Sequence, residues 1–505
     1  MISYLKIGNT YLKLNLYESG GILADDDQKD SKEFLIRITQ AANTIKKHID
    51  THEFIRVISH IDADGLAAAS ILGKSLQRAE AFFRIRIVKQ LNEEIVNELS
   101  SEDHSLLIFM DLGSGSLDLL GDQFKDCELI ILDHHKPMDV TIPQLIHVNP
   151  HLSNYDGARE ISGAGVTYLT AKTIDNINID LAPLAIVGAL GDSQDKNDKR
   201  GLIGLNEKIV DDAVKAGCIS VEKDLLLFGR ETRPIHKALA YTTNPFIPGL
   251  SNAEDKCLGF LNNLDIDLKL HDRWRVINDL TVEEKEKIFS KIATYLSSKG
   301  SPDSDALRLI GKIYTLTHED RFKPMRDGRE YASFLNACGR MMKGGLGVAV
   351  AMGSRGETLD EALETLATYK KTLSQYLDWV IQTPKVLRKL KNIYVIDGFD
   401  KIDELIIGTI ADILSSSYLK EKMPIIALTS TEDGMVKVSG RIPHNFNRGN
   451  LDLGTIFHEI STKLNGRGGG HNFAAGALLP KNSENQFVKS INKLVGSIHH
   501  TINTD

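Results

Sequence analysis

Residues 55–65 read IRVISHIDADG, an apolar run that ends in a polar turn closed by glycine. The run predicts a buried β-strand, and the alanine-rich GLAAASILGK that begins at Gly65 predicts a helix. His60, Asp62 and Asp64 occupy alternate positions just past the strand, where an extended backbone points alternate side chains to one face. Taken alone, DADG is usually a turn with an aspartate cap before a helix, so a metal site here needs further support.

Three more apolar segments end in polar residues. SLLIFM (105–110) precedes Asp111, CELIIL (127–132) precedes Asp133, His134 and His135, and LAPLAIVGALG (181–191) precedes Asp192. We interpret each segment as a strand, because parallel strands gather the loops at their carboxyl ends along one edge of a sheet. Carboxylates and imidazoles gathered there could hold two divalent cations and activate water against a phosphoester. A mixed oxygen and imidazole set suits Mn²⁺ or a similar ion.

The pattern along the chain predicts an α/β protein. Strands alternate with helices from residue 55 to about 191, which is typical of a parallel sheet covered on both faces. Residues 205–330 read as mostly helical, and beyond residue 345 strands mix with helices, including a long amphipathic helix over 359–390. We therefore predict a catalytic domain over 1–204 with an N-terminal extension over 1–54, a helical insertion over 205–335, and a second mixed α/β domain over 336–505.

Composition narrows the class of protein. The net charge of −8 over 505 residues argues against a surface that coats nucleic acid, so any polyanion site must be local. There is no secretory leader pattern and no run of about eighteen apolar residues, which predicts a cytoplasmic protein without a membrane span. The four cysteines are far apart, as is typical of buried thiols in a reducing compartment. The absence of a GxSxG elbow or a Cys–His pair disfavours covalent catalysis.

The ordered motifs HxDxDG, strand-Asp, DHH and GDxxD, followed by GRGGGHNFAAGA (466–477), resemble the DHH phosphoesterase superfamily. Within it they are most similar to the archaeal RecJ-like branch, the GINS-associated nuclease type. The resemblance spans the chain and implies a parallel-sheet DHH catalytic domain and a DHH-associated substrate-binding domain. Asp111 and Asp192 would bridge two divalent ions, with Mn²⁺ favoured and Mg²⁺ or Co²⁺ as alternatives. The implied ligands are His60, Asp62, Asp64, Asp111, His134 and Asp192.

The resemblance also assigns roles within and beyond the DHH motif. Asp133, His134 and His135 form the implied catalytic motif, in which Asp133 orients its neighbours and His135 either faces the phosphate or supports the metal ligands. In the second domain, SGR matches the family's S-x-R segment, whose guanidinium can grip a terminal phosphate. Glycines there would let the backbone approach a sugar-phosphate, although a plain loop is the simpler alternative. The candidate substrate-binding residues are Ser439, Arg441, Gly468, Gly469, Gly470 and His471.

The implied function is removal of nucleotides from an end of single-stranded DNA, with 5′ to 3′ polarity, in DNA replication or repair. RNA is an alternative substrate. Two other functions stay open. One is a replication-fork scaffold that binds the GINS complex and the MCM helicase, although a pure scaffold would not need the complete ligand set. The other is a phosphodiesterase for short oligonucleotides or cyclic dinucleotides, although the helical insertion favours a longer substrate or a protein partner.

Overall fold

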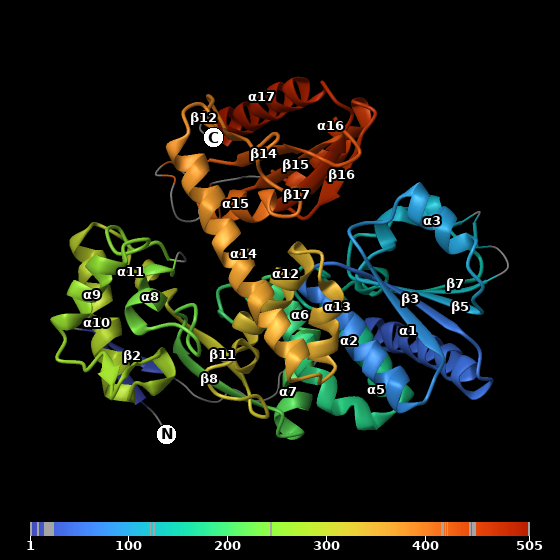
Figure 1. Cartoon of the computed structure of the whole chain (residues 1–505), viewed down its shortest axis with the longest axis horizontal. Helices are drawn as coiled ribbons and strands as arrows, with labels where there is room; N and C mark the ends of the chain where they lie inside the picture. Colours follow the sequence, from blue (N-terminus) through green and yellow to red (C-terminus); the bar gives the residue numbers. More distant parts are fainter. Residues whose placement is uncertain are drawn as a thin grey trace. The chain divides into compact units, whose positions relative to one another are not determined.

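A computed structural model describes residues 3–7, 10–14 and 25–502, apart from 122, 125–126, 243–244, 416–418, 420, 422, 444–445 and 447–450. The chain divides into two compact units, which are described separately below (Figure 1). The first unit comprises Met1–Leu239 and Pro248–Ala332, and the second comprises Ala240–Ile247 and Ser333–Asp505. Among the described residues, no helix combines the length and the apolar character needed to cross a membrane.

The first unit contains a five-stranded parallel sheet with the strand order β4-β3-β5-β6-β7 (blue to teal in Figure 1). Its central strands are apolar and almost entirely buried, as a parallel sheet between two helical layers requires. All four strand pairings are parallel, which confirms the prediction. The strands are β3 (Ile55–His60), β4 (Phe83–Val88), β5 (Leu106–Met110), β6 (Glu128–Leu132) and β7 (Leu145–Val148).

Helices cover both faces of this sheet. On one face α1, α2 and α5 pack against the strands, and α6 packs on α2 and α5. On the other face α3 and α4 contribute Val96, Leu99 and Leu117 to a buried apolar cluster. The alanines of α2 are fully buried, so this helix lies close to its neighbours. The bounds are α1 (Asp25–Asp50), α2 (Ala63–Arg78), α3 (Glu93–Ser100), α4 (Leu117–Leu120), α5 (Gly163–Ile174) and α6 (Ala182–Gly191).

One strand prediction in this unit is wrong. The apolar segment 181–191, expected as a strand before Asp192, forms the buried helix α6. Pro183 lies in the first turn of α6, where the missing N–H leaves no hydrogen bond unmade. A short, wholly apolar segment does not reveal its period, so the pattern could not separate a strand from a buried helix. Asp192 therefore follows the C-terminus of a helix.

In the remainder of the first unit helices contribute more residues than strands, in line with the prediction, but irregular segments and unpredicted strands are also present. An antiparallel pair joins β8 to β11, and a short hairpin joins β9 to β10. Helix α10 begins with a capping box in which Thr281 and Glu284 each bond the other's backbone N–H. The elements are β1 (Ser3–Ile7), β2 (Thr10–Leu14), α7 (Leu205–Lys215), β8 (Ile219–Leu225), α8 (Ile235–Ala240), α9 (Glu254–Asn262), β9 (Lys269–Leu270), β10 (Arg273–Trp274), α10 (Val282–Ser298), α11 (Asp303–Leu307) and β11 (Ile310–Leu316).

The second unit is built on a mixed sheet with the order β12-β13-β14-β15-β17-β16 (orange to red in Figure 1). One face of the sheet packs on α16 and α17 through residues such as Val438, Phe457 and Phe487. Helix α12 (Gly328–Arg340) begins in the first unit and ends in the second. The other elements are α13 (Gly344–Ala351), α14 (Glu357–Gln382), β12 (Leu387–Lys389), β13 (Tyr394–Asp397), α15 (Ile407–Ile413), β14 (Ile425–Ser430), β15 (Val436–Arg441), α16 (Leu453–Lys463), β16 (Arg467–Gly470), β17 (Ala474–Leu479) and α17 (Glu484–Ile502).

The long helix predicted over 359–390 ends earlier than expected. Helix α14 stops at Gln382, and residues 387–389 form the edge strand β12. Pro384 explains the stop, because proline disfavours helical geometry in the residue before it and cannot donate a backbone hydrogen bond.

Candidate metal centre

The polar residues that follow β3, β5, β6 and α6 meet at one edge of the parallel sheet. Their ligand atoms form three overlapping groups, and within each group all atoms lie within 4.8 Å of one another. The groups are Asp111 with Asp133, His134 and His135; His60 with Asp62 and Asp111; and Asp64 with His134 and Asp192. The structure thus brings together every residue of the predicted cluster. Their role as ligands stays a prediction.

Asp111 lies at the middle of the cluster. Its side chain is buried, and neither carboxylate oxygen accepts a hydrogen bond from the described residues. Imidazole nitrogens face it instead, with His60 Nδ1 at 3.4 Å and His134 Nε2 at 3.2 Å. Its backbone has a φ of 56°, a left-handed conformation that is uncommon for a residue with a side chain and is enriched at functional sites. A buried carboxylate with no hydrogen bond to supplement these two imidazole contacts is costly to ionise, and a cation would relieve that cost.

Asp64 connects the cluster to the fold. Its two carboxylate oxygens accept hydrogen bonds from the backbone N–H groups of Gly163 (2.6 Å) and Ala164 (3.0 Å), in the first turn of α5. Burial raises the pKa of Asp64 well above its usual value, and the nearby carboxylates of Asp111 and Asp192 raise it further. Three carboxylates held this closely need positive charge between them.

Two histidines supply part of that charge when no metal is bound. Burial alone would lower the pKa of His60 and of His134, but the carboxylates around each ring outweigh burial and raise both pKa values well above normal. The Nδ1 of His134 lies 2.6 Å from the carbonyl oxygen of Gly157 and can donate to it. This contact leaves Nε2 facing the carboxylates, as in a metal-binding imidazole held by its other nitrogen. A divalent cation here would displace protons, so the residues present fit a metal site.

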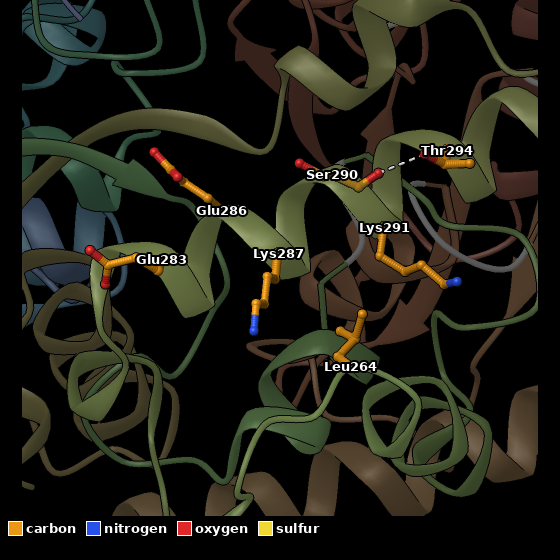
Figure 2. Close-up of a pocket in the computed structure, with 7 residues that line it drawn as sticks. All are labelled: Leu264, Glu283, Glu286, Lys287, Ser290, Lys291 and Thr294. Carbon is orange, nitrogen blue, oxygen red and sulfur yellow. Dashed lines mark hydrogen bonds between the residues drawn. The ribbon is translucent and has the colours of Figure 1, made fainter. Parts of the chain in front are cut away.

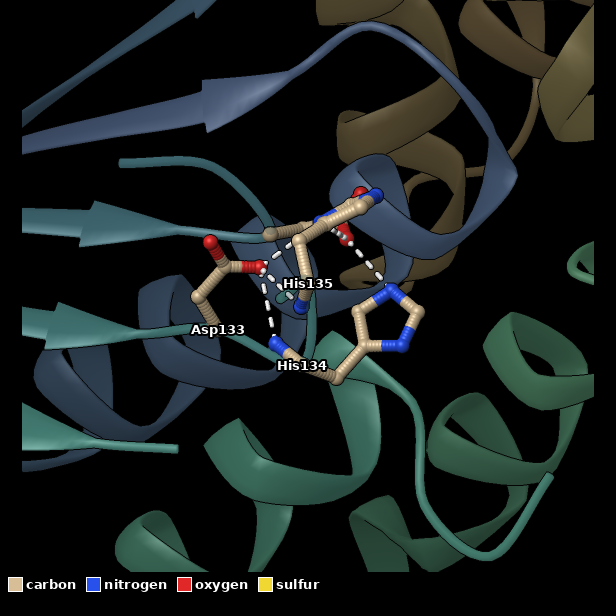
Figure 3. A group of neighbouring side chains, drawn as sticks. Asp133, His134 and His135 are labelled. Carbon is tan, nitrogen blue, oxygen red and sulfur yellow. Dashed lines mark hydrogen bonds and ion pairs between the residues drawn. The ribbon is translucent and has the colours of Figure 1, made fainter. Parts of the chain in front are cut away.

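Asp133 makes different contacts from its neighbours. Figure 3 shows its carboxylate bonded to the backbone of its own motif. One oxygen accepts from the backbone N–H groups of His134 (2.7 Å) and His135 (3.2 Å) and lies 2.8 Å from His135 Nδ1. The other accepts from the N–H of Ser114 at 3.0 Å. Burial opposes ionisation, but His135 and these hydrogen bonds outweigh it and hold the pKa of Asp133 well below normal. These contacts support an orienting role.

Sequence reasoning missed the residues that hold the cluster in place. Gln194 Nε2 donates to the Gly157 carbonyl at 2.9 Å, the same oxygen that faces His134, and Asn206 in turn donates to Gln194 Oε1 at 2.6 Å. Gln194 lies in the GDSQD motif, so its proximity to Asp192 was an available signal. Gly157 lies in a loop whose sequence contains no signal of its role.

Four glycines leave room for the ligand side chains. A Cβ atom on Gly188 would overlap Asp64 Oδ1, and one on Gly163 would lie 2.8 Å from Asp111 Cβ. Cβ atoms on Gly65 and Gly157 would overlap the carbonyl oxygens of His60 and His134. The cluster is therefore packed against backbone that has no room for a side chain.

In the second unit, Ser439 and Arg441 share one face of β15. A Cβ atom on Gly408, in α15, would lie 3.3 Å from Ser439 Oγ and 3.0 Å from Arg441 Nη2, so both side chains point toward this helix. Burial lowers the pKa of Arg441, and the positive charge of a second guanidinium, Arg340, lowers it further. The carboxylate of Asp412 raises the pKa and offsets part of this decrease. Two guanidiniums close enough for one to lower the pKa of the other are suited to an anion.

The glycines of β16 divide into two kinds. A Cβ atom on Gly468 would crowd Ser461 and Phe457 of α16, and Gly470 has a φ of 139° and no room beside Ala474. Gly469 has open space where a side chain would stand. The strand register places Gly469 opposite Gly476, and Gly476 opposite Ser439. His471 donates its backbone N–H to the carbonyl of Ala474 (2.8 Å) in the turn that follows. Of the predicted glycines, Gly469 is the one with an open Cβ position, on the same sheet face as Ser439 but one strand further away.

Comparison with known proteins agrees with this architecture. Residues 54–189 match the DHH family N-terminal domain, 227–310 match the DHH-CID domain, and 391–497 match the DHHA1 domain. The uncharacterized protein MJ0831 of Methanocaldococcus jannaschii is 32% identical over 472 residues, which cover 92% of this chain and 98% of that protein. The chain belongs to the DHH superfamily. The resemblance expected from its motifs is thereby confirmed.

Solved structures show that this DHH protein has a RecJ-like fold. RecJ of Thermus thermophilus in complex with Mn²⁺ has a TM-score of 0.55 at 18% identity, and the match covers 91% of this chain and 55% of RecJ. CDC45 of Entamoeba histolytica has a TM-score of 0.60 at 14% identity, covering 91% and 98% of the two chains. The single-stranded-DNA-specific exonuclease RecJ of Bacillus subtilis is 25% identical over 174 residues, 32% of this chain and 22% of that protein.

Proposed function

We propose that this DHH protein is a metal-dependent phosphodiesterase that removes nucleotides from an end of single-stranded nucleic acid. The observation that carries the proposal is the buried carboxylate of Asp111, which accepts no hydrogen bond from the described residues and stands between two imidazoles. Two divalent cations bound there would activate water and stabilise charge on the phosphoryl oxygens. The ions would be held by His60, Asp62, Asp64, Asp111, His134 and Asp192, and the Mn²⁺ complex of a RecJ relative favours Mn²⁺.

The DHH motif would position both the cations and the substrate. Asp133 fixes the backbone of His134 and His135, and Gly157 fixes the ring of His134. The side chain of His135 is 37% exposed, so its ring can reach a phosphate. Burial lowers the pKa of His135, but Asp133 outweighs this and raises it above normal. A protonated imidazole there would donate to a phosphate oxygen.

The second unit would bind the terminal phosphate. Arg441 and Ser439 supply donors from β15, and Arg340 adds positive charge nearby. Gly469 and Gly476 remove side chains beside these donors, so the backbone can approach a sugar-phosphate. The substrate class comes from RecJ relatives, and the 5′ to 3′ polarity and the DNA preference are part of the proposal.

Gly469→Leu should impair substrate binding without unfolding the protein. The new side chain would occupy the open space on the Ser439 face of the sheet, and among the described residues no atom lies within 4 Å of its Cβ. We expect KM for an oligonucleotide to rise at least about tenfold while kcat changes little, because the metal centre is untouched. Gly345→Leu in α13 is the matched control, since its Cβ also has open space. Equal KM values for the two variants would contradict the proposal that β16 is part of the substrate-binding site.

A degradation assay tests the proposed function. The protein is incubated with Mn²⁺ and single-stranded DNA or RNA labelled at the 5′ or the 3′ end, beside duplex DNA and dinucleotides, with EDTA as the control. We expect mononucleotides from the 5′ end of single-stranded DNA, and no product with EDTA. Cleavage of dinucleotides alone would instead assign a short-oligonucleotide enzyme. No cleavage by protein shown to bind Mn²⁺ would reject the enzymatic proposal.

A replication scaffold that binds GINS and MCM is the alternative function. The likeness to CDC45 has 14% identity and shows the fold alone. What favours catalysis is the intact cluster of carboxylates and imidazoles, which binding to a protein partner would not require. Replacing Asp133, His134 and His135 by alanine should abolish cleavage, whereas any association with GINS should survive.

A further inference from the structure

An exposed aromatic and basic cluster surrounds the hairpin of β9 and β10. Trp274 is 38% exposed and Phe322 is 44% exposed. Lys269 Nζ lies 4.9 Å from the centroid of the Trp274 ring, and the guanidinium carbons of Arg273 and Arg321 lie 4.7 and 4.9 Å from that of Phe322. We call these five residues the hairpin patch.

Buried polar groups hold the hairpin patch in place from below. Asp279 bonds Arg273 through both carboxylate oxygens, at 2.6 and 3.1 Å, and also reaches Arg321 at 3.1 Å, so one carboxylate sets two guanidiniums side by side. His236 is 7% exposed, its ring centroid lies 4.7 Å from that of Trp274, and its Nδ1 has no hydrogen-bond partner among the described residues. The surface is therefore built in advance of any ligand.

Phe322 adds a second unusual feature. Its φ is 66°, which is uncommon for a bulky residue and carries a conformational cost. Its backbone N–H donates to the buried carboxylate of Glu231 at 3.3 Å, which helps to keep the strained backbone in place. A large apolar ring is thus held in solvent by a buried contact.

We propose that the hairpin patch is an accessory binding surface for single-stranded nucleic acid, made of residues that belong neither to the metal centre nor to β15. Aromatic rings and guanidinium planes stack on unpaired bases, while lysine and arginine neutralise phosphates. An apolar partner would bury Lys269, whose one described side-chain contact is the Trp274 ring, without a counter-ion, and that burial is costly. Because the protein carries a net charge of −8, a polyanion needs a local basic surface, and this one combines cations with ring faces. The ligand class rests on the proposed function.

Binding without cleavage tests the inference on the full chain. Fluorescence anisotropy in EDTA would follow a labelled oligothymidylate of about 20 nucleotides, longer than one typical site. We expect Trp274→Leu to weaken binding roughly tenfold. The pair Arg273→Gln and Arg321→Gln should also lower the slope of log K against log salt by about 1.4. Lys269→Gln, whose one described contact is with the Trp274 ring, should weaken binding without disturbing Asp279.

The matched control lies on α10 in the same domain. Figure 2 shows Lys287 and Lys291 lining an open groove with Glu283 and Glu286, outside the hairpin patch. Lys291→Gln removes the same charge as Lys269→Gln and should leave binding unchanged. Equal affinities for wild type, Lys269→Gln and Trp274→Leu would overturn the inference.

A direct contact can be observed through tryptophan fluorescence. The chain has two tryptophans, so Trp379→Phe leaves Trp274 as the single emitter. Adding the oligothymidylate in EDTA should quench it, and salt should restore the emission. The absence of quenching would overturn the inference. Tighter binding of a polyglutamate peptide that the oligothymidylate does not displace would also overturn it, because it would assign the patch to an acidic protein. Quenching without cleavage in Mn²⁺ would reject the proposed function and keep the patch.

Discussion

Replacing Asp111 with asparagine should lower the rate of Mn²⁺-dependent phosphodiester hydrolysis by at least about a thousandfold. The substitution keeps the shape of the side chain but exchanges one anionic oxygen for an NH₂ group, which cannot bind a cation. Metal ions stabilise the transition state by several kcal/mol, and each 1.36 kcal/mol corresponds to a factor of ten in rate. The left-handed backbone of Asp111 suits asparagine equally well, so the fold should not suffer.

The stability of the metal-free variant separates a ligand from a structural residue. Burial raises the pKa of Asp111, and the carboxylate of Asp62 raises it further, which means that the ionised form is disfavoured where it stands. Asparagine removes that cost, so the metal-free variant should unfold at the same denaturant concentration as wild type or a higher one. Asp118→Asn, at an exposed position on α4, is the control and should change neither rate nor stability. Wild-type activity in Asp111→Asn would refute the proposed metal centre.

Gly188→Ala should disrupt both stability and metal binding, although a single methyl group is added. The new Cβ atom would overlap Asp64 Oδ1 and lie 2.6 Å from Ala164 Cβ, inside packed helices that have no room to move. Overpacking typically costs 1–3 kcal/mol, and displacement of Asp64 from the start of α5 removes a cap, so we expect a loss of about 3 kcal/mol. Urea unfolding measures this loss, and calorimetric titration with Mn²⁺ should show affinity reduced at least about tenfold.

Gly259→Ala is the matched control for Gly188→Ala. Gly259 is an exposed residue of α9 with open space at its Cβ position, so alanine there should stabilise the helix by up to about 1 kcal/mol. Mn²⁺ should raise the unfolding midpoint of wild type and of Gly259→Ala by the same amount and that of Gly188→Ala by less, because the weaker site stabilises the folded protein less. Equal stabilisation of all three proteins by Mn²⁺ would contradict the position assigned to Asp64.

The sequence predicted the parallel sheet because apolar strands alternate with helices. It predicted that the cluster residues lie close together because they follow predicted strands whose carboxyl ends meet at one edge of that sheet. It did not separate a strand from a helix over 181–191, where the segment is apolar throughout and no period shows. It overextended the helix after Leu359 because amphipathic spacing continued past the proline at 384. The predicted domain limits stay a prediction.

Other parts of the site depend on contacts that no local pattern encodes. The use of the Gly157 carbonyl by both His134 and Gln194 joins three segments that are distant in sequence. The need for glycine at position 188 follows from the approach of α2 to α6 and becomes visible only once the helices are packed. The hairpin patch likewise brings the hairpin of β9 and β10 into contact with Phe322, about fifty residues further along the chain. A local sequence pattern does not predict a contact between segments so far apart.

Asp64 has two sets of partners, because the carboxylate oxygens that face the cluster also accept hydrogen bonds from the backbone N–H groups of Gly163 and Ala164. When a cation attracts the carboxylate of Asp64, the strength of its hydrogen bonds to these two amides must change. The hydrogen-exchange rates of the two amides therefore report whether metal is bound, without any substrate. Protein purified through a chelator would in that case differ from freshly loaded protein in the exchange rates of these two amides at the start of α5.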